Sequence, residues 1–299
     1  MTATIPAGWT SELQSLARII FGFLVFRHGM EQVFGFPAAW QESAPTSLLG
    51  VLKLLCFPGG LLIMLGAFTR PAALVLSLAH LGYWLVEPLP DYWLQGRRLF
   101  GAGGAPSDHI LLPGFFFLYV SFSGPGAWSL DRLFAGSAPR HPADVSEADV
   151  PGAGVAKQTR RAAQQTRRAT YALGALRIVA GFLFLFHGLP KLFGPVAPDP
   201  LSLRAVAGVL ECVGGPMLMA GLFTRPLAFL LSGQMAFAYF MSHAPEGFWG
   251  SFAGPNQEAA ILNCFLFLFL WAAGPGAWSL DGRRQLARTG GHMKFESVI

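Results

Sequence analysis

The octapeptide GPGAWSLD occupies residues 124–131 and recurs unchanged at 274–281, each time at the end of a long apolar stretch. Further matches lie upstream in the same order: FTRP at 68–71 and 223–226, HG at 28–29 and 187–188, and an Arg at 18 and 177. The offset between equivalents drifts only from 159 residues (187 minus 28) to 150 residues (274 minus 124). Small loop deletions account for that drift, so we interpret the chain as a tandem duplication with one structural unit in each half.

The composition predicts an all-α integral membrane protein. Hydrophobic residues make up 53% of the chain and charged residues only 12%, about half the share of an ordinary soluble domain. A membrane-spanning helix needs about 20 predominantly apolar residues. Eight segments come close enough to be candidate transmembrane helices: 16–34, 48–66, 72–88, 109–124, 174–193, 205–221, 227–243 and 258–274. A large soluble helical protein is the disfavoured alternative.

The distribution of charge predicts the orientation of these helices. Of the 21 Lys and Arg residues, only six lie outside the termini, the Thr-Arg-Pro turns and the central stretch: Arg27, Lys53, Arg97, Arg98, Lys191 and Arg204. Cytoplasmic loops are enriched in Lys and Arg, so both termini are expected in the cytoplasm. The basic run 157–168 is then a linker facing water or lipid headgroups, and we expect no nucleic-acid partner.

The repeat predicts two parallel four-helix bundles. We expect units at 13–134 and 171–284, a cytoplasmic linker at 135–170 and a cytoplasmic tail at 285–299. Four spans per half give both halves the same orientation, with a pseudo-twofold axis along the membrane normal. A small-molecule transporter is less favoured, because many transporters use inverted repeats with broken helices.

No cysteine motif indicates a metal or redox site. Cys56, Cys212 and Cys264 all lie inside apolar segments and form no Cys-x-x-Cys pair. We therefore expect packing roles for them, no metal site and no intrinsic cofactor.

Polar residues of the second half collect at the extracytoplasmic end of the expected bundle. His187, Glu211, His243 and Glu258 come from four different helices at similar depth. In the first half His28 matches His187 and Asp108 matches Glu258, whereas Cys56 replaces Glu211. Ionisable side chains inside spans are costly and normally face the bundle interior, so we expect His187, Glu211 and Glu258 to point into the second bundle.

Several roles stay open for these residues. A structural polar pair, such as Glu211 with His187, would fix the helix register, and His243 and Glu258 could simply reach interfacial water. Alternatively, His187, Glu211 and Glu258 are candidate catalytic residues that handle protons, and His28, His187 and His243 are candidate cofactor-binding residues. A haem bound by His28 and His187 is the less favoured form of the second alternative.

The assembled motifs resemble the DoxX family of bacterial integral membrane proteins. They are an Arg early in the first helix, His-Gly followed by Phe-Gly at its end, Glu-x-x-Gly-Gly at 211–215, the Gly-x-Phe-Thr-Arg turn at 221–225, the acidic Glu258 and the Gly-Pro-Gly-x-Trp-Ser-Leu-Asp ending. The resemblance covers about 110–120 residues twice. Because members of the family are typically single four-helix units, the chain looks like a fused dimer.

The resemblance implies a function connected with electron transfer in the bacterial cytoplasmic (inner) membrane. Relatives include small membrane subunits of a thiosulfate:quinone oxidoreductase. The leading hypothesis is a non-catalytic accessory subunit of a respiratory or other electron-transfer complex, with lipids and other membrane subunits as its partners. The alternative is a quinone-linked oxidoreductase component, in which Glu211 and His187 take protons from a quinol bound in an outer-leaflet pocket.

Overall fold

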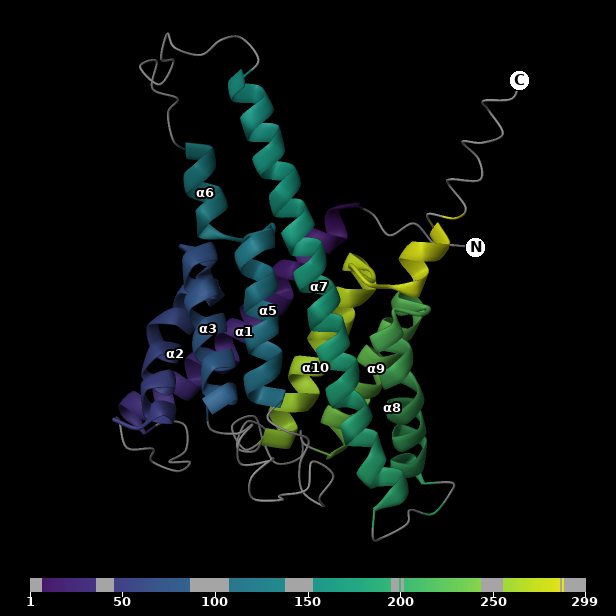
Figure 1. Ribbon diagram of the computed structural model, residues 1–299. Coiled ribbons are helices and arrows are strands. Elements are labelled where there is room, and N and C mark those ends of the chain that lie inside the picture. Colours follow the sequence, from purple (N-terminus) through teal and green to yellow (C-terminus); the bar gives the residue numbers. More distant parts are fainter. Residues whose placement is uncertain are drawn as a thin grey trace, which may run out of the picture.

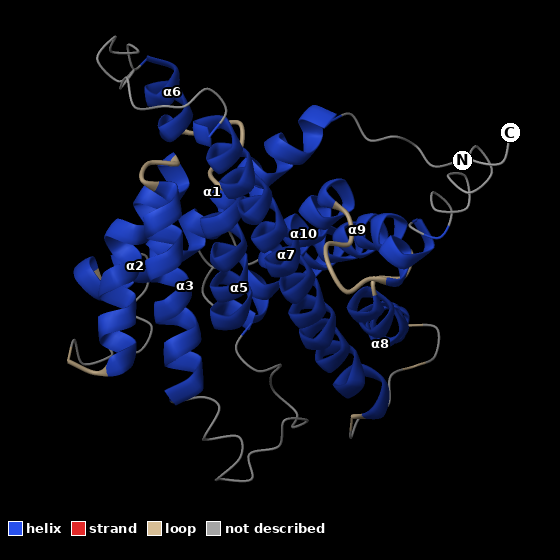
Figure 2. Ribbon diagram, turned by 45° about the horizontal axis from the view of Figure 1, so that its top comes forward, coloured by secondary structure: helices blue, strands red, loops and turns tan. Residues whose placement is uncertain are grey.

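The computed structural model describes residues 7–35, 46–86, 108–137, 153–194, 199, 202–242, 255–285 and 287, and all regular structure in these ranges is helical (Figures 1 and 2). The helices are α1 (Ala7–Phe34), α2 (Leu48–Leu65), α3 (Thr69–Val86), α5 (Asp108–Ser123), α6 (Leu130–Ser137), α7 (Ala153–Phe193), α8 (Leu203–Ala220), α9 (Thr224–Ser242) and α10 (Pro255–Ala273). Each of the eight expected apolar segments lies on one of these helices. Two features were not foreseen in this form: the short helix α6, and the start of α7 at residue 153.

Three helices are long and apolar enough to cross a membrane by length and composition. They are found among the described residues at Leu48–Leu65, Thr159–Phe193 and Leu203–Ala220, and two shorter apolar helices lie at Asp108–Ser123 and Glu258–Ala273. The all-α membrane class is supported by these helices. The full number of eight spans stays a prediction.

Equivalent caps define the second helix of each half. Ser47 and Ser202 precede α2 and α8, and each serine hydroxyl accepts a hydrogen bond from the backbone N–H three residues later. Gly66 and Gly221 end these helices with φ of 68° and 64°, the left-handed conformation that glycine adopts without strain. The capping residues and the helices between them therefore repeat at an offset of 155 residues (202 minus 47).

The fourth helix of each half packs against the first helix of the other half. Within the halves, α1 pairs with α2, α3 with α5, α7 with α8 and α9 with α10; between the halves, α5 packs on α7 and α10 packs on α1. The two units therefore contact each other through the first and fourth helices of each half. This reciprocity is typical of an isologous interface, in which a twofold relation produces each contact twice.

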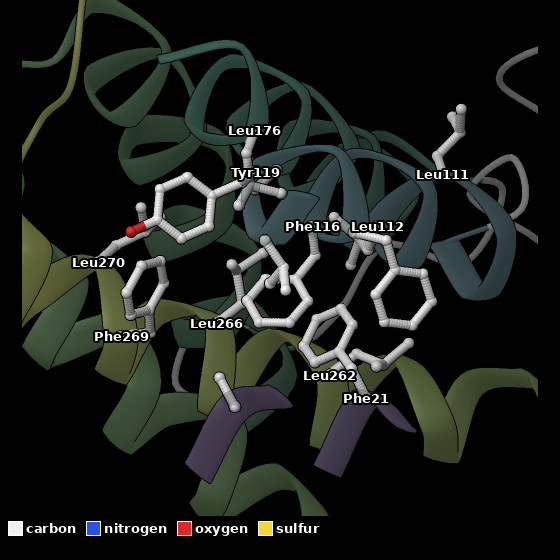
Figure 3. Close-up of a cluster of buried hydrophobic side chains, with 14 of the residues drawn as sticks. Phe21, Leu111, Leu112, Phe116, Tyr119, Leu176, Leu262, Leu266, Phe269 and Leu270 are labelled. Carbon is white, nitrogen blue, oxygen red and sulfur yellow. The ribbon is translucent and has the colours of Figure 1, made fainter. Parts of the chain in front are cut away.

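Aromatic side chains fill the centre where the two units meet. The rings of Phe21 (α1) and Phe116 (α5) stack at 4.3 Å, and Phe116 also meets Phe269 of α10 edge to face. Figure 3 shows these rings with Leu262 and Leu266 of α10 between α1 and α5. The hydrophobic core is thus shared by both halves and lies at their junction.

Two buried arginines bind the repeated turns at one end of the molecule, which we call the arginine end (Arg18, Arg177 and both GPGAWSLD turns). Arg18 is fully buried and donates hydrogen bonds to the carbonyl oxygens of Met64, Pro125 and Trp128. Arg177 is also fully buried and donates to the carbonyls of Leu218, Ala277 and Trp278. Each guanidinium therefore joins the end of the second helix to the turn that follows the fourth.

The aspartate that ends each octapeptide binds the N-terminus of the third helix of its half. Asp131 accepts hydrogen bonds from the N–H groups of Phe68 (2.7 Å) and Thr69 (2.8 Å), and Asp281 does the same at Phe223 and Thr224. Although partial burial opposes its ionisation, these bonds hold the pKa of Asp131 below its ordinary value. In each half, the repeated motifs thus hold the ends of the second, third and fourth helices together.

Figure 1 shows α6 and the start of α7 at this same end, with α7 extending past the neighbouring helices. Arg160, Arg161, Arg167 and Arg168 are exposed on that extension. The basic run of the sequence is therefore a helical continuation of α7.

Candidate functional site

Ionisable side chains from five helices lie at the opposite end, which we call the histidine end (His28, Asp108, His187, Glu211 and Glu258). Asp108 is the first residue of α5, where the positive end of the helix dipole favours a carboxylate. Its Oδ2 lies 2.5 Å from Nε2 of His187 on α7. Asp108 is buried and His187 is 23% exposed, so the imidazole is the accessible member of the pair.

The equivalent pair joins Glu258 of the second half to His28 of the first half. Oε2 of Glu258, near the start of α10, lies 3.1 Å from Nε2 of His28 on α1. Its other carboxylate oxygen accepts a hydrogen bond from Arg27, which also binds Glu31 one turn along α1. All three of these charged side chains are less than a tenth exposed.

Glu211 has its partners within the second half. Nζ of Lys191 lies 2.5 and 2.6 Å from the two carboxylate oxygens of Glu211, and Nε2 of Gln234 lies 2.9 Å from Oε1. Lys191 follows His187 by four residues on α7, so the two side chains lie on the same face of that helix. The sequence argument missed Lys191 as a partner, although this spacing from His187 was a usable signal.

The structure brings the candidate residues together in a different grouping from the one expected. His187 pairs with Asp108 and Glu258 pairs with His28, so both pairs cross between the halves, and only Glu211 is satisfied inside the second unit. The expected convergence inside the second bundle was wrong in this respect, because α5 and α10 pack on the opposite units. His243 lies outside the described residues. The catalytic role of His187, Glu211 and Glu258, and the cofactor role of His28, His187 and His243, stay predictions.

The two reciprocal pairs differ in their neighbours. Arg27 supplies a fixed positive charge to Glu258, whereas the equivalent position of α7 is Phe186, which is buried. Within the described chain, Oδ1 of Asp108 is buried and has no hydrogen-bond partner. Among the described residues, the Asp108 carboxylate therefore has His187 as its one basic partner and keeps one oxygen without a hydrogen bond.

Two further histidines, His109 and His80, belong to the first half. The ring of His109 on α5 is 6.3 Å from that of His28, and His80 on α3 is buried with Nδ1 hydrogen-bonded to the carbonyl of Leu76. His80 was not singled out from the sequence, although a lone histidine in the apolar stretch 72–88 was visible there. Among the described residues, no group of three or more His, Cys, Asp or Glu side chains is arranged to hold a metal ion.

Comparison with known proteins places the repeat in a family. The DoxX family model matches residues 13–87 and again 172–244. An uncharacterized protein of Haemophilus influenzae is 41% identical over 124 residues, which are 38% of this chain and 90% of that protein. No solved structure matches the chain.

Two other relatives are membrane proteins by name. An uncharacterized membrane protein of Mycobacterium tuberculosis is 31% identical over 129 residues, covering 36% of this chain and 78% of the relative. The inner membrane protein YphA of Escherichia coli is 31% identical over 122 residues, covering 36% of this chain and 86% of the relative. These relatives match over most of their own length but over less than two fifths of this chain, as expected for a tandem duplication of a single unit. The protein is therefore a membrane protein that belongs to the DoxX family, and its chain contains the family's unit twice.

Proposed function

We propose that the protein is an accessory membrane subunit of an electron-transfer assembly and that its histidine end is mainly structural. The observation that carries the proposal is the pairing of each carboxylate there with a basic side chain of the same chain. Asp108 binds His187, Glu258 binds Arg27 and His28, and Glu211 binds Lys191. Buried ion pairs are weak sources of net stability but strongly penalise any arrangement that separates the partners. Such pairs suit a scaffold that must hold two units in one relative position.

The outer surface of the helices supports the same proposal. Large apolar side chains are exposed on α2, α3, α8 and α9, among them Val51, Leu78, Val213 and Phe237. An apolar exterior of this kind packs against lipid or against other membrane subunits. The connection with electron transfer comes from the family resemblance, which includes small membrane subunits of a thiosulfate:quinone oxidoreductase.

Native purification tests this proposal. The tagged full chain is extracted in mild detergent, separated on a native gel, and the co-migrating proteins are identified by mass spectrometry and by their haem, flavin or iron–sulfur absorbance. We expect redox subunits to co-migrate and their assembled amount to fall when the gene is deleted. A chain that migrates without redox subunits, in cells whose respiratory complexes are unaffected by the deletion, would contradict the proposal.

A second candidate function is quinol binding at the Asp108–His187 pair. The observation that favours it is the difference between the two reciprocal pairs: Asp108 has a free buried oxygen and no arginine, whereas Glu258 is neutralised by Arg27. A carboxylate–histidine pair of this kind can take a proton from a bound hydroxyl. Oxidation of a quinol releases two protons and two electrons, so the electrons would pass to a redox partner while the pair and water take the protons.

Conservative substitutions separate the two functions. If the site oxidises quinol, Asp108→Asn and Glu211→Gln should lower quinol-dependent reduction of the partner, by about 100-fold for Asp108→Asn, while folded protein is retained. If the site is structural, the same changes should lower the yield of folded protein, because removing one charge leaves the other buried without a partner. Unchanged yield together with unchanged activity would exclude both roles for these residues.

A further inference from the structure

Polar residues of the first half stand where the second half has apolar ones. In the order from the histidine end to the arginine end, the equivalent positions are His109 and Ala259, His80 and Met235, Tyr119 and Phe269, Gln14 and Leu173, and Ser123 and Ala273. These positions follow from the offsets of 159, 155 and 150 residues that align the repeated motifs. The difference therefore runs through α1, α3 and α5 of the first half from one end of the unit to the other.

The second half shows that the fold does not require these polar groups. α7, α9 and α10 make the same pattern of helix packing with Leu, Met, Phe and Ala at the equivalent positions. Polar and ionisable side chains inside a membrane protein are expensive to bury, and their presence there indicates a function by default. A column of such groups in one unit alone therefore calls for an explanation other than folding.

At the arginine end, three of the polar groups form a continuous hydrogen-bonded chain. The hydroxyl of Tyr119 donates to Oε1 of Gln14 at 3.2 Å, and Nε2 of Gln14 donates to the hydroxyl of Ser123 at 3.0 Å. Tyr119 and Gln14 are buried, whereas Ser123 is partly exposed. Figure 3 shows the Tyr119 ring in the core beside Phe269, its apolar equivalent. This chain runs along one turn of α5, from the buried Tyr119 to the partly exposed Ser123.

At the histidine end, the column begins with His28 and His109. His28 is 22% exposed and bound to Glu258, and its ring lies 6.3 Å from that of His109. His80 lies deeper: it packs against α5 beside Gly114, and its ring meets Phe117 edge to face. Gly114 is five residues from His109 and five from Tyr119. The helix axis of α5 therefore rises about 7.5 Å from His109 to Gly114 and about 7.5 Å more from Gly114 to Tyr119.

Ser77 on α3 is buried, and its equivalent in the second half is Ser232, whose hydroxyl donates to the carbonyl of Cys264. Ser77 precedes His80 by three residues, about one helical turn toward the arginine end, and unlike that of Ser232 its buried hydroxyl has no hydrogen-bond partner among the described residues. Buried polar atoms of this kind are normally satisfied by water. A gap of about 7.5 Å needs two or more water molecules in a row, because each hydrogen bond spans only about 2.8 Å.

From this arrangement we propose that the first half contains a proton-conducting path between the two ends of the molecule. Protons pass between the hydroxyls of Ser123 and Tyr119 at the arginine end, which Gln14 positions by its hydrogen bonds to both. They continue through Ser77 and His80 in the middle to His109 and His28 at the histidine end, with chains of two or more water molecules across the longer gaps. The direction is set by the pH difference and the membrane potential. This activity does not depend on the proposed role in an electron-transfer assembly, because the path needs no electron donor.

Proton flux into liposomes tests the proposal directly. The full chain is reconstituted into liposomes that contain a pH-sensitive dye, and a potassium gradient with valinomycin drives protons inward. Wild-type protein should acidify the interior faster than protein-free liposomes do. His80→Met and Tyr119→Phe should each lower the protein-dependent rate by about tenfold or more, because a positioned proton-transfer group commonly contributes 100-fold or more.

The second half provides the matched controls. His80→Met and Tyr119→Phe introduce the residues that α9 and α10 already carry at the equivalent positions, so both variants are expected to fold, as monitored by gel filtration. Met235→Leu in the second half should leave the rate unchanged. The proposal is overturned if wild-type protein conducts no faster than empty liposomes, if the folded Tyr119 and His80 variants keep the wild-type rate, or if Met235→Leu lowers the rate equally.

Discussion

Arg27 is the residue that distinguishes the two reciprocal pairs of the histidine end. Its side chain is 6% exposed and contacts two carboxylates, Glu31 on its own helix and Glu258 on α10. Because α10 belongs to the other half, Arg27 joins the units as well as neutralising the charge. Phe186, at the equivalent position of α7, can do neither.

Arg27→Met should destabilise the protein, by about 3–5 kcal/mol, because it leaves two buried carboxylates without their cation. The unfolding temperature in detergent, followed by loss of the monodisperse peak in gel filtration, measures the effect. A double variant, Arg27→Gln with Glu258→Gln, should recover part of the loss, since two neutral amides can still hydrogen-bond. An Arg27→Met protein with the wild-type unfolding temperature would show that the ion pair is irrelevant to stability.

At the scale of the element, α1 and α2 approach each other so closely that their backbones touch. A Cβ atom added to Gly60 would lie 2.4 Å from the backbone nitrogen of Phe26, and one added to Gly29 would lie 2.2 Å from that of Phe57. The equivalent pair α7 and α8 has the same feature at Gly215, whose added Cβ would lie 2.7 Å from the carbonyl oxygen of Gly181. Small residues at such contacts are typical of membrane helices, which associate through close packing.

Gly60→Ala should therefore lower stability by about 1–3 kcal/mol, because an added methyl group in a closely packed contact forces the helices apart. Gly82→Ala on α3 is the matched control, since an added Cβ there meets nothing within 4 Å. The control should be neutral or slightly stabilising, because alanine favours a helix over glycine. Equal unfolding temperatures for the two variants, measured as above, would refute the close-packing explanation.

At the scale of the whole molecule, the chain forms a closed sequence of packed helices in which each half completes the other. α5 lies on α7 and α10 lies on α1, and the charged pairs of the histidine end follow these two contacts. The arginine end and the histidine end lie at opposite ends of these helices, and we expect them on opposite faces of the membrane. The excess of Lys and Arg near the arginine end predicts that this face is cytoplasmic.

Cysteine labelling tests that topology. In a background without the three native cysteines, single cysteines at Gly103, in the chain between α3 and α5, and at Ala153, the first residue of α7, are exposed to a membrane-impermeant maleimide in intact cells. We expect labelling at Gly103 and protection at Ala153 until the membrane is permeabilised, because an odd number of spans separates the two sites. The same accessibility at both positions would contradict the eight-span arrangement.

Much of the architecture could be predicted from the order of residues alone. The signals are local, and each indicates a helix or the end of a helix. They are the apolar segments of helical length, the repeated octapeptide, and the serine and glycine caps at 47, 66, 202 and 221. The duplication followed from comparing one half with the other. The hydrogen bonds of Arg18 and Asp131 then give both repeated motifs a structural role.

The grouping of the site was a different matter. The sequence by itself determined that His28, Asp108, His187 and Glu258 lie at one end of their helices, since helix length converts position in the chain into depth. It did not determine which carboxylate meets which histidine, because Asp108 and Glu258 have the same depth and either could face its own half or the other. Only the tertiary structure decided this, through the packing of α5 on α7 and of α10 on α1. Those contacts depend on side chains far apart in the chain, Phe21 with Phe116 and Phe116 with Phe269, and no local pattern encodes such long-range packing.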